Sequence, residues 1–174
     1  RLMEQFDQMS SQLKHVKPKE IQDIKQRLKE EKGQGGAYYC SLPSFRDSYR
    51  LVTRMLERSG QSAYLMLCSL TDGKGHPLEK PEKLELLSEE LQNTIQHCLR
   101  KGDSFTKYSP SQYLVLLIGT NKENCGLIFD RIRKYFAREH RSWNKYVEFY
   151  VSSVAEVDNL DTPIQFRNDD SGWK

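Results

Sequence analysis

Two strand-like runs joined by a very short turn constrain the fold of this chain more than any other feature. The first run is Asp103–Tyr108 and the second is Tyr113–Ile118, with Ser109-Pro110-Ser111-Gln112 between them. A connection this short joins neighbouring strands as a hairpin. Pro110 lacks an N–H and fixes φ, so the turn has neither the donor nor the freedom that glycine would give it. The sequence therefore predicts a tight hairpin closed by an unusually stiff turn.

The spacing of apolar residues places this hairpin within a longer order of elements. A nearly continuous apolar run over 61–70 predicts a strand buried on both faces. Helical spacing predicts helices over 41–59, 81–99 and 121–136, the last with Asn121 as its N-cap, and alternation predicts a strand over 146–155. After the first of these helices the order is βαββαβ. This order predicts an α+β fold with a ferredoxin-like sheet, the arrangement that nucleotide-cyclase-type domains elaborate.

A glycine-rich break divides the chain into two parts. Before it, apolar residues at helical spacing predict an α-helical hairpin over 1–32, with Pro18 in the first turn of its second helix. The break begins a linker over 33–40, which leads into a domain over 41–155 and a polar C-terminal tail over 156–174. Because the chain enters directly into a helical pattern, we expect it to be a fragment of a longer protein.

Composition excludes several classes of function. A net charge of +3 over 174 residues is too small to indicate nucleic acid by itself. The histidines lack metal-ligand spacing, and no C-x-x-C pair exists, so we expect no metal or other cofactor and free thiols at Cys40, Cys68, Cys98 and Cys125. No apolar run could span a bilayer, so the sequence predicts a cytoplasmic protein without a membrane partner.

The region 37–155 resembles a GGDEF domain, the fold of diguanylate cyclases. The resemblance rests on the long helix that ends Leu99-Arg100-Lys101-Gly102-Asp103 and on the hairpin that follows, whose turn Ser109-Pro110-Ser111-Gln112-Tyr113 corresponds to the family motif. In active members, two acids end the first strand and two stand on the turn, where they position magnesium for phosphoryl transfer. None of the corresponding residues here is a carboxylate: Cys68, Leu70, Ser111 and Gln112. If the alignment of the first strand with the family is shifted by a residue or two, Asp72 is the only acid that comes near the first-strand positions.

The glycine pair of the family motif is also missing, since Ser109 and Pro110 stand in its place. Glycines would let the turn backbone approach a nucleotide, and proline cannot donate to a phosphate. The resemblance therefore implies the fold without the chemistry, and we expect no enzyme activity.

One feature of the family is retained. Arg100 and Asp103 match its R-x-x-D pattern, five residues before the turn, where the family's inhibitory site holds cyclic di-GMP. A guanidinium group binds a phosphate or a guanine edge through two parallel hydrogen bonds, and a carboxylate accepts hydrogen bonds from guanine N–H groups. The alternative is structural, because an arginine at a helix C-terminus favours the helix dipole and Gly-Asp turns the chain into the next strand.

The stretch His15–Ile24 resembles the last helix pair of the bacterial transcriptional activator domain, a TPR-like array. Tyr108-Ser109-Pro110-Ser111-Gln112 matches the Tyr-Ser-x-Ser-Gln turn of GGDEF-like domains in SARP-type regulators. The combination implies a non-catalytic signal-input or dimerisation domain of a bacterial transcriptional regulator. It would act as a homodimer or on a partner domain of the same protein, and DNA would be contacted only by an upstream domain absent from this chain.

Two alternatives remain open. A sensor of cyclic di-GMP or of another nucleotide would use Arg100 and Asp103. A nucleic-acid-binding ferredoxin-like domain would use the basic and aromatic stretch 131–145. However, 113–118 lacks the RNA-recognition pattern, and a solvated helix end whose long side chains cover apolar surface is the more common explanation of such a stretch. The residues of that stretch are Arg131, Arg133, Lys134, Tyr135, Phe136, Arg138, His140, Arg141, Trp143 and Lys145.

Overall fold

The computed structural model describes residues 4, 17–29, 35–155 and 167–168, and the chain divides into two units, Arg1–Gln34 and Gly35–Lys174. In the first unit, α2 (Pro18–Leu28) is the second helix of the predicted amino-terminal pair, with proline in its first turn. The first helix of that pair lies, apart from Glu4, outside the described residues. No residue of α2 is buried, and its apolar side chains Ile21, Ile24 and Leu28 are exposed.

The second unit is organised by a six-stranded sheet with the strand order β1-β3-β4-β2-β5-β6. The strands are β1 (Tyr38–Tyr39), β2 (Ala63–Leu70), β3 (Ser104–Ser109), β4 (Gln112–Ile118), β5 (Val147–Ser153) and β6 (Arg167–Asn168). The four long strands β3-β4-β2-β5 are antiparallel throughout, which confirms the predicted ferredoxin-like arrangement. The two short strands lie at the edges, β1 parallel to β3 and β6 antiparallel to β5.

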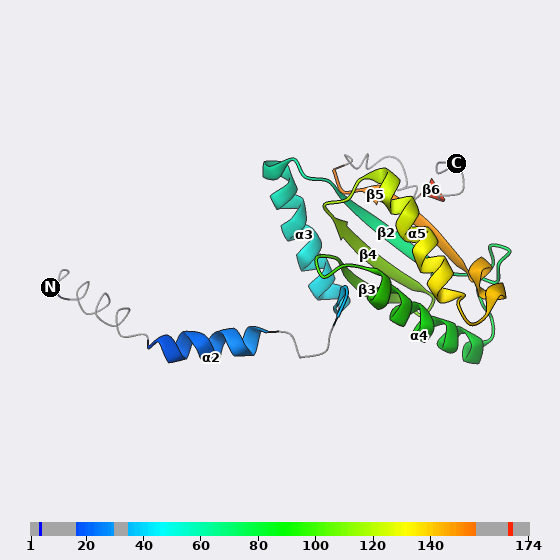
Figure 1. The fold of residues 1–174 in the computed structure, drawn as a ribbon, viewed down its shortest axis with the longest axis horizontal. Coiled ribbons are helices and arrows are strands. Elements are labelled where there is room, and N and C mark those ends of the chain that lie inside the picture. The colour runs from blue at the N-terminus through cyan, green and yellow to red at the C-terminus, as the bar shows by residue number, and fades with distance from the viewer. Residues whose placement is uncertain (1–3, 5–16, 30–34, 156–166, 169–174) are drawn as a thin grey trace. The chain divides into compact units, whose positions relative to one another are not determined.

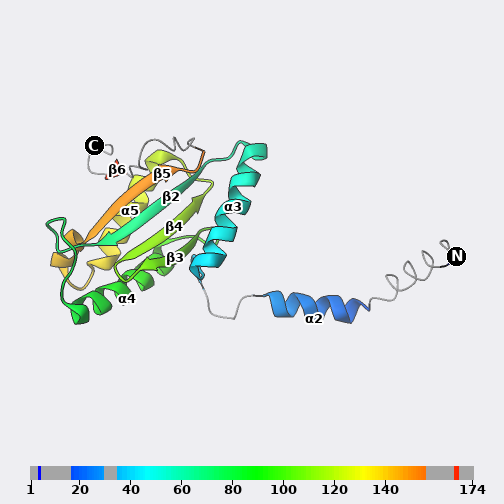
Figure 2. The same ribbon diagram turned by 180° about the vertical axis from the view of Figure 1, so that it is seen from behind.

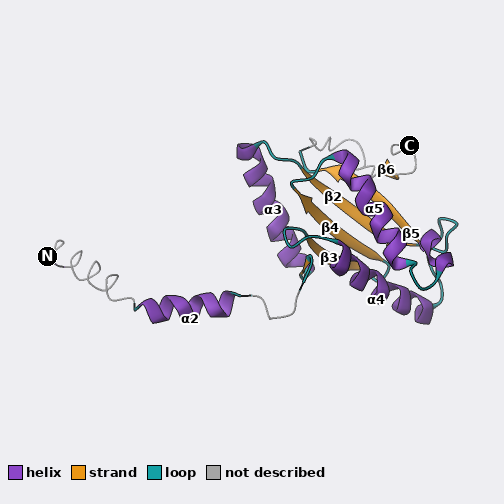
Figure 3. Cartoon of the chain, in the orientation of Figure 1, coloured by secondary structure: helices purple, strands orange, loops and turns teal. Residues whose placement is uncertain are grey.

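The helices form layers on the two faces of the sheet (Figures 1 and 3). They are α3 (Leu42–Ser59), α4 (Pro81–Cys98) and α5 (Lys122–Phe136), and a short 3-10 helix, η1 (Arg141–Tyr146), follows α5. The predicted N-cap is present, since the Asn121 side chain accepts from the N–H of Asn124 at 2.8 Å. α3 ends at Ser59 and is capped by Gly60, whose φ of 66° lies in the left-handed region.

Strand alternation divides the core between the two faces. Met66 and its neighbours at every second position pack with α4 and α5, where Phe129 stacks on Phe149 with ring centroids 4.8 Å apart. The other face of β2 and β4 packs against α3 through Phe45. Figure 2 shows the ribbon from the side on which α3 lies. The prediction of a strand packed on both faces is confirmed at β2. The four cysteines are buried and free, and no helix in the described part of the chain could cross a membrane.

Candidate functional site

The hairpin turn between β3 and β4 is closed by neutral side chains that hydrogen-bond to one another. Ser109 Oγ donates to Gln112 Oε1 at 3.0 Å, and Gln112 Nε2 donates to Ser69 Oγ at 3.5 Å on the neighbouring strand. Neither Pro110 nor Ser111 has a positive φ, and the register of β3 shifts just before the turn. The turn is therefore built without glycine and without a charged group.

The positions at which the family carries catalytic acids do not form a magnesium site. Cys68 and Leu70 are buried among the α4 and α5 side chains. Asp72 is the one acid nearby in sequence, and its Oδ1 accepts from the backbone N–H groups of Lys74 and His76, which lower the pKa of its carboxyl. Among the described residues, no cluster of three or more His, Cys, Asp or Glu side chains could hold a metal ion. The positions that the resemblance aligns with the family's acids therefore carry no carboxylate.

Arg100 and Asp103 lie together in one tight turn between α4 and β3. Asp103 Oδ2 accepts from the N–H of Arg100, and Oδ1 accepts from the N–H of Ile118, both at 3.2 Å. The Asp103 side chain is 2% exposed, whereas that of Arg100 is 64% exposed, with Nε 4.0 Å from Asp103 Oδ2. Burial raises the pKa of the Asp103 carboxyl, and the two N–H groups and Arg100 oppose this effect only in part. Asp103 thus holds the turn, and the guanidinium of Arg100 is presented to solvent.

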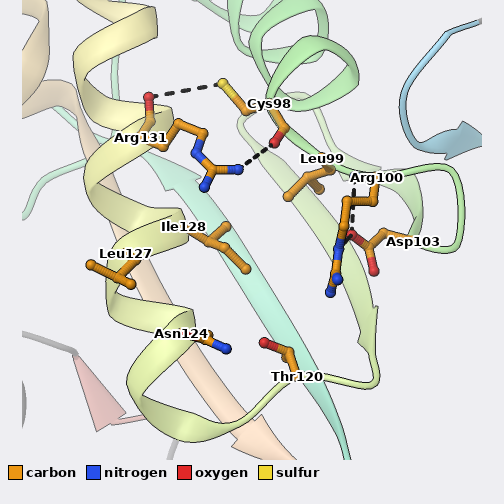
Figure 4. Close-up of a pocket in the computed structure, with 9 residues that line it drawn as sticks. All are labelled: Cys98, Leu99, Arg100, Asp103, Thr120, Asn124, Leu127, Ile128 and Arg131. Carbon is orange, nitrogen blue, oxygen red and sulfur yellow. Dashed lines mark hydrogen bonds and ion pairs between the residues drawn. The ribbon is translucent and has the colours of Figure 1, made fainter.

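A pocket of about 240 Å³ opens beside this turn (Figure 4). Four segments of the second unit supply its walls: the end of α4, the turn itself, the residue before the N-cap of α5, and one face of α5. The lining residues are Cys98, Leu99, Arg100, Asp103, Thr120, Asn124, Leu127, Ile128 and Arg131. Two guanidinium groups from different elements therefore border one pocket, which an amide and an exposed leucine also line.

Arg131 joins α5 to the end of α4 at the edge of this pocket. Its Nη1 donates to the carbonyl of Cys98 at 3.3 Å, and Cys98 Sγ donates to the carbonyl of Arg131 at 3.8 Å (Figure 4). The sequence does not predict that Arg131 and Arg100 border the same pocket, because Arg131 is assigned there to the basic stretch. The available signal is helical spacing, since Asn124, Leu127 or Ile128, and Arg131 share one face of α5.

The basic stretch 131–145 does not present its aromatic rings as a free stacking platform. Phe136 is 1% exposed, and Trp143 packs against it with ring centroids 5.5 Å apart. Tyr135 stacks on His97 at 4.2 Å and carries the guanidinium of Arg138 on its ring at 4.0 Å. The stretch therefore lacks the open rings on which single-stranded nucleic acids stack.

Comparison with known proteins identifies the fold. No protein-family model matches the sequence, and no curated protein matches it. The solved structures that it resembles include a diguanylate cyclase from Thermotoga maritima, at 16% identity and a TM-score of 0.51 over 67% of this chain and 79% of that one. The coiled coil and GGDEF domain of DgcB from Caulobacter crescentus, in complex with c-di-GMP, matches at 10% identity and a TM-score of 0.55 over 87% and 82%.

A third match is the diguanylate cyclase SiaD of Pseudomonas aeruginosa, solved with its activator SiaC. It is 16% identical with a TM-score of 0.55, and the match covers 90% of this chain and 62% of SiaD. At these identities the likeness shows the fold alone. The chain has a GGDEF-like fold, as the sequence predicts.

These comparisons correct the main functional hypothesis. The sequence suggests a signal-input or dimerisation domain of a bacterial transcriptional regulator, and this interpretation is wrong, because the structures that share the fold are diguanylate cyclases. The suggestion depends on the stretch His15–Ile24 together with the turn Tyr108–Gln112, and residues 15 and 16 lie outside the described part of the chain. A helix pair is too common an element for about ten residues to specify a parent protein.

Proposed function

We propose that this domain binds a cyclic dinucleotide, with cyclic di-GMP as the first candidate, in the pocket between the Arg100–Asp103 turn and α5. The observation that carries the proposal is the convergence of Arg100 and Arg131 on that pocket from two different elements. A cyclic dinucleotide offers two phosphates and two guanine edges, and guanidinium binds either of these groups bidentately. In DgcB the same fold has been solved with c-di-GMP.

The neighbouring side chains suit the rest of such a ligand. Leu127 is 62% exposed on α5 and offers an apolar contact for the face of a base. Asn124 supplies an amide donor and acceptor one turn earlier on the helix. The volume of about 240 Å³ is smaller than that of typical small-molecule sites, which span roughly 300–1,000 Å³. The pocket therefore accommodates one end of a cyclic dinucleotide and leaves the other end outside it.

In this proposal Asp103 acts through Arg100 rather than on the ligand. Both of its carboxylate oxygens already accept backbone N–H groups, and its side chain is buried. The carboxylate fixes the turn that presents Arg100, so that binding does not have to order the turn as well. Arg100 and Arg131 are the contact residues, and Asp103 is the positioning residue.

The proposal includes the absence of cyclase activity. The neutral turn Ser109–Tyr113 and the buried Cys68 and Leu70 offer no carboxylate pair for magnesium. Without that pair, nothing neutralises the charge of two triphosphates or activates the attacking hydroxyl. The domain would act as a cytoplasmic receptor for a dinucleotide that other proteins make.

Calorimetric titration with cyclic di-GMP tests this function, with GTP and ATP as comparison ligands. Arg100→Ala and Arg131→Ala should each weaken binding by at least about tenfold, because each removes a charge-assisted contact. Lys101→Ala is the matched control, since Lys101 is exposed and adjacent to Arg100 but does not line the pocket, and it should leave affinity within about twofold.

Two results would contradict the proposal. Absence of heat with cyclic di-GMP, or binding that both arginine variants retain, would show that this pocket is not the receptor site. Formation of cyclic di-GMP from GTP and magnesium would refute the non-catalytic part and leave the binding part to be judged from the titration.

A further inference from the structure

A second hollow, with a volume of about 510 Å³, lies at the opposite end of α5 from its N-cap. Its walls come from the last turns of α5 and from η1, the short helix that follows α5 in Figure 1. We call it the basic hollow, and its charged and amide side chains are Asp130, Arg133, Lys134, Arg138, Arg141 and Asn144. It shares no lining residue with the pocket at the Arg100–Asp103 turn.

The charge of the basic hollow exceeds what the helix end needs. Cations in the last turn of a helix stabilise its dipole, which accounts for Arg133 and Lys134 on α5. It does not account for Arg141, which is contributed by η1 and converges on the same volume. The four lining cations stand beside one lining carboxylate, Asp130, and Arg138 is also paired with Glu90 at 2.6 Å. The side chains that line the hollow therefore carry three more positive charges than negative ones.

Two of the arginines are held in place before any ligand arrives. Arg138 Nη1 donates to Glu90 Oε1 at 2.6 Å and to the carbonyl of Tyr135 at 2.9 Å, and its guanidinium lies 4.0 Å from the Tyr135 ring. The guanidinium of Arg133 lies 5.0 Å from the ring of Phe149. Side chains ordered in advance lose less conformational entropy when they bind an anion. The basic hollow is thus preorganised in a way that loose surface lysines are not.

The aromatic contacts decide which part of a ligand the hollow would recognise. Tyr135 lies between His97 and Arg138, and Trp143 packs against both Phe136 and His140. A base or a single-stranded nucleic acid would need an open ring to stack on. The hollow offers guanidinium, ammonium and amide donors instead, and these are the groups that bind phosphate oxygens.

We propose that the basic hollow binds a chain of two or three phosphates, as carried by a nucleoside triphosphate or by inorganic polyphosphate. Four cations, on α5, on η1 and on the segment between them, suit several closely spaced phosphate groups better than a single one, and the volume lies within the range of small-molecule sites. The two sources share the phosphate chain as the recognised group. The proposal does not depend on cyclic dinucleotide binding, because the two sites have no residue in common.

Calorimetry on the full chain, at about 20 mM and about 150 mM NaCl, tests this site with inorganic tripolyphosphate, GTP and GMP. The test variant is Lys134→Gln with Arg141→Gln, both exposed positions that leave the Arg138–Glu90 pair intact. The matched control is Lys122→Gln at the other end of the same helix. Circular dichroism of each variant checks that the fold is unchanged.

Tripolyphosphate should bind, more weakly at the higher salt concentration, and the double variant should lower its affinity by at least about tenfold. The Lys122→Gln control and Arg100→Ala should bind it within about twofold of the native protein, and GMP should bind far more weakly than GTP. Equal affinity for GTP and tripolyphosphate would identify the phosphate chain as sufficient, whereas tighter GTP binding would add a contribution from the nucleoside.

Three results would overturn the proposal: no tripolyphosphate binding at the lower salt concentration, unchanged binding in the double variant, or binding of GTP without any binding of tripolyphosphate. Cyclic di-GMP titrated into the double variant separates the two sites. Its affinity should be unchanged, so failure of the phosphate site leaves the dinucleotide proposal standing, and the reverse also holds.

Discussion

At the scale of single residues, Asp103 couples the fold to pH. Its carboxyl is buried, and burial raises its pKa above the ordinary value of 3.8 despite the N–H groups of Arg100 and Ile118. The folded protein therefore binds this proton more tightly than the unfolded chain does. The resulting contribution to the free energy of unfolding is present at low pH and is lost as the pH rises through the folded-state pKa.

Asp103→Asn should remove that pH dependence while it removes only one of the two backbone hydrogen bonds, because the amide oxygen still accepts one N–H. The difference in unfolding free energy between the native protein and this variant should be larger near pH 4 than near pH 7. Urea unfolding across this range measures it. A difference that grows toward neutral pH would mean that the hydrogen bonds to the charged form outweigh burial.

Gly36 cannot be replaced by a residue with a side chain unless the surrounding backbone moves. Its φ is 76°, and a Cβ there would lie 1.8 Å from the backbone oxygen of Gln96. Gly36→Ala should therefore cost about 2–4 kcal/mol of unfolding free energy. Gly35→Ala is the matched control, since a Cβ at Gly35 meets nothing within 4 Å, and it should change stability by less than about 0.5 kcal/mol. Equal effects of the two substitutions would contradict the close approach.

At the scale of elements, α3 carries a row of like charges along its exposed side. Arg46, Arg50, Arg54 and Arg58 follow one another at four-residue intervals, and all are exposed. Like charges four apart on a helix destabilise it by roughly 0.2–0.5 kcal/mol a pair, and opposite charges stabilise it by as much. Arg50→Glu converts two repulsive pairs, with Arg46 and Arg54, into attractive ones, and it converts the attractive pair with Asp47 three residues earlier into a repulsive one. Helix propensity is unchanged.

Because the loss at Asp47 offsets one of the two gains, this substitution should raise the unfolding free energy by about 0.5 kcal/mol at low salt, and Arg50→Gln should give about half of that. Because exposed charges are screened, the gain should largely disappear in about 1 M NaCl. Urea unfolding at both salt concentrations checks the expectation. A gain that survives high salt would have a source other than charge.

The long elements could be predicted from the sequence because each has a local pattern. The hairpin 103–118, α4 and α5 show clear periodicity, and the N-cap of α5 follows from Asn121 alone. β1 could not be predicted, because two residues carry no period and its pairing with Ser104 depends on the rest of the sheet. The pocket could not be predicted as a whole, because its walls come from segments separated in sequence and the burial of Asp103 depends on Ile118.

At the scale of the whole molecule, the second unit contains both described cores, and the linker is attached to it at a definite place. Gln96 Nε2 donates to the carbonyls of Gly35 and Ala37 at 2.5 and 2.6 Å. The next residues pair with β3, where the N–H of Tyr38 donates to the carbonyl of Asp103 at 2.9 Å. By contrast, α2 buries no residue. Within the second unit, the described stabilising contacts therefore begin at Gly35.

Two truncations test where the folding unit begins. Removal of residues 1–34 should change the unfolding free energy by less than about 0.5 kcal/mol, because it leaves the Gln96 contacts and β1 in place. Removal of residues 1–40 deletes six further residues, among them the buried Ala37 and Cys40, and should cost about 2–4 kcal/mol through lost burial and unpaired carbonyls on β3. Urea unfolding of both fragments gives the comparison. If the shorter deletion is as damaging as the longer one, residues before Gly35 belong to the cooperative fold, and the proposed boundary moves toward the amino terminus.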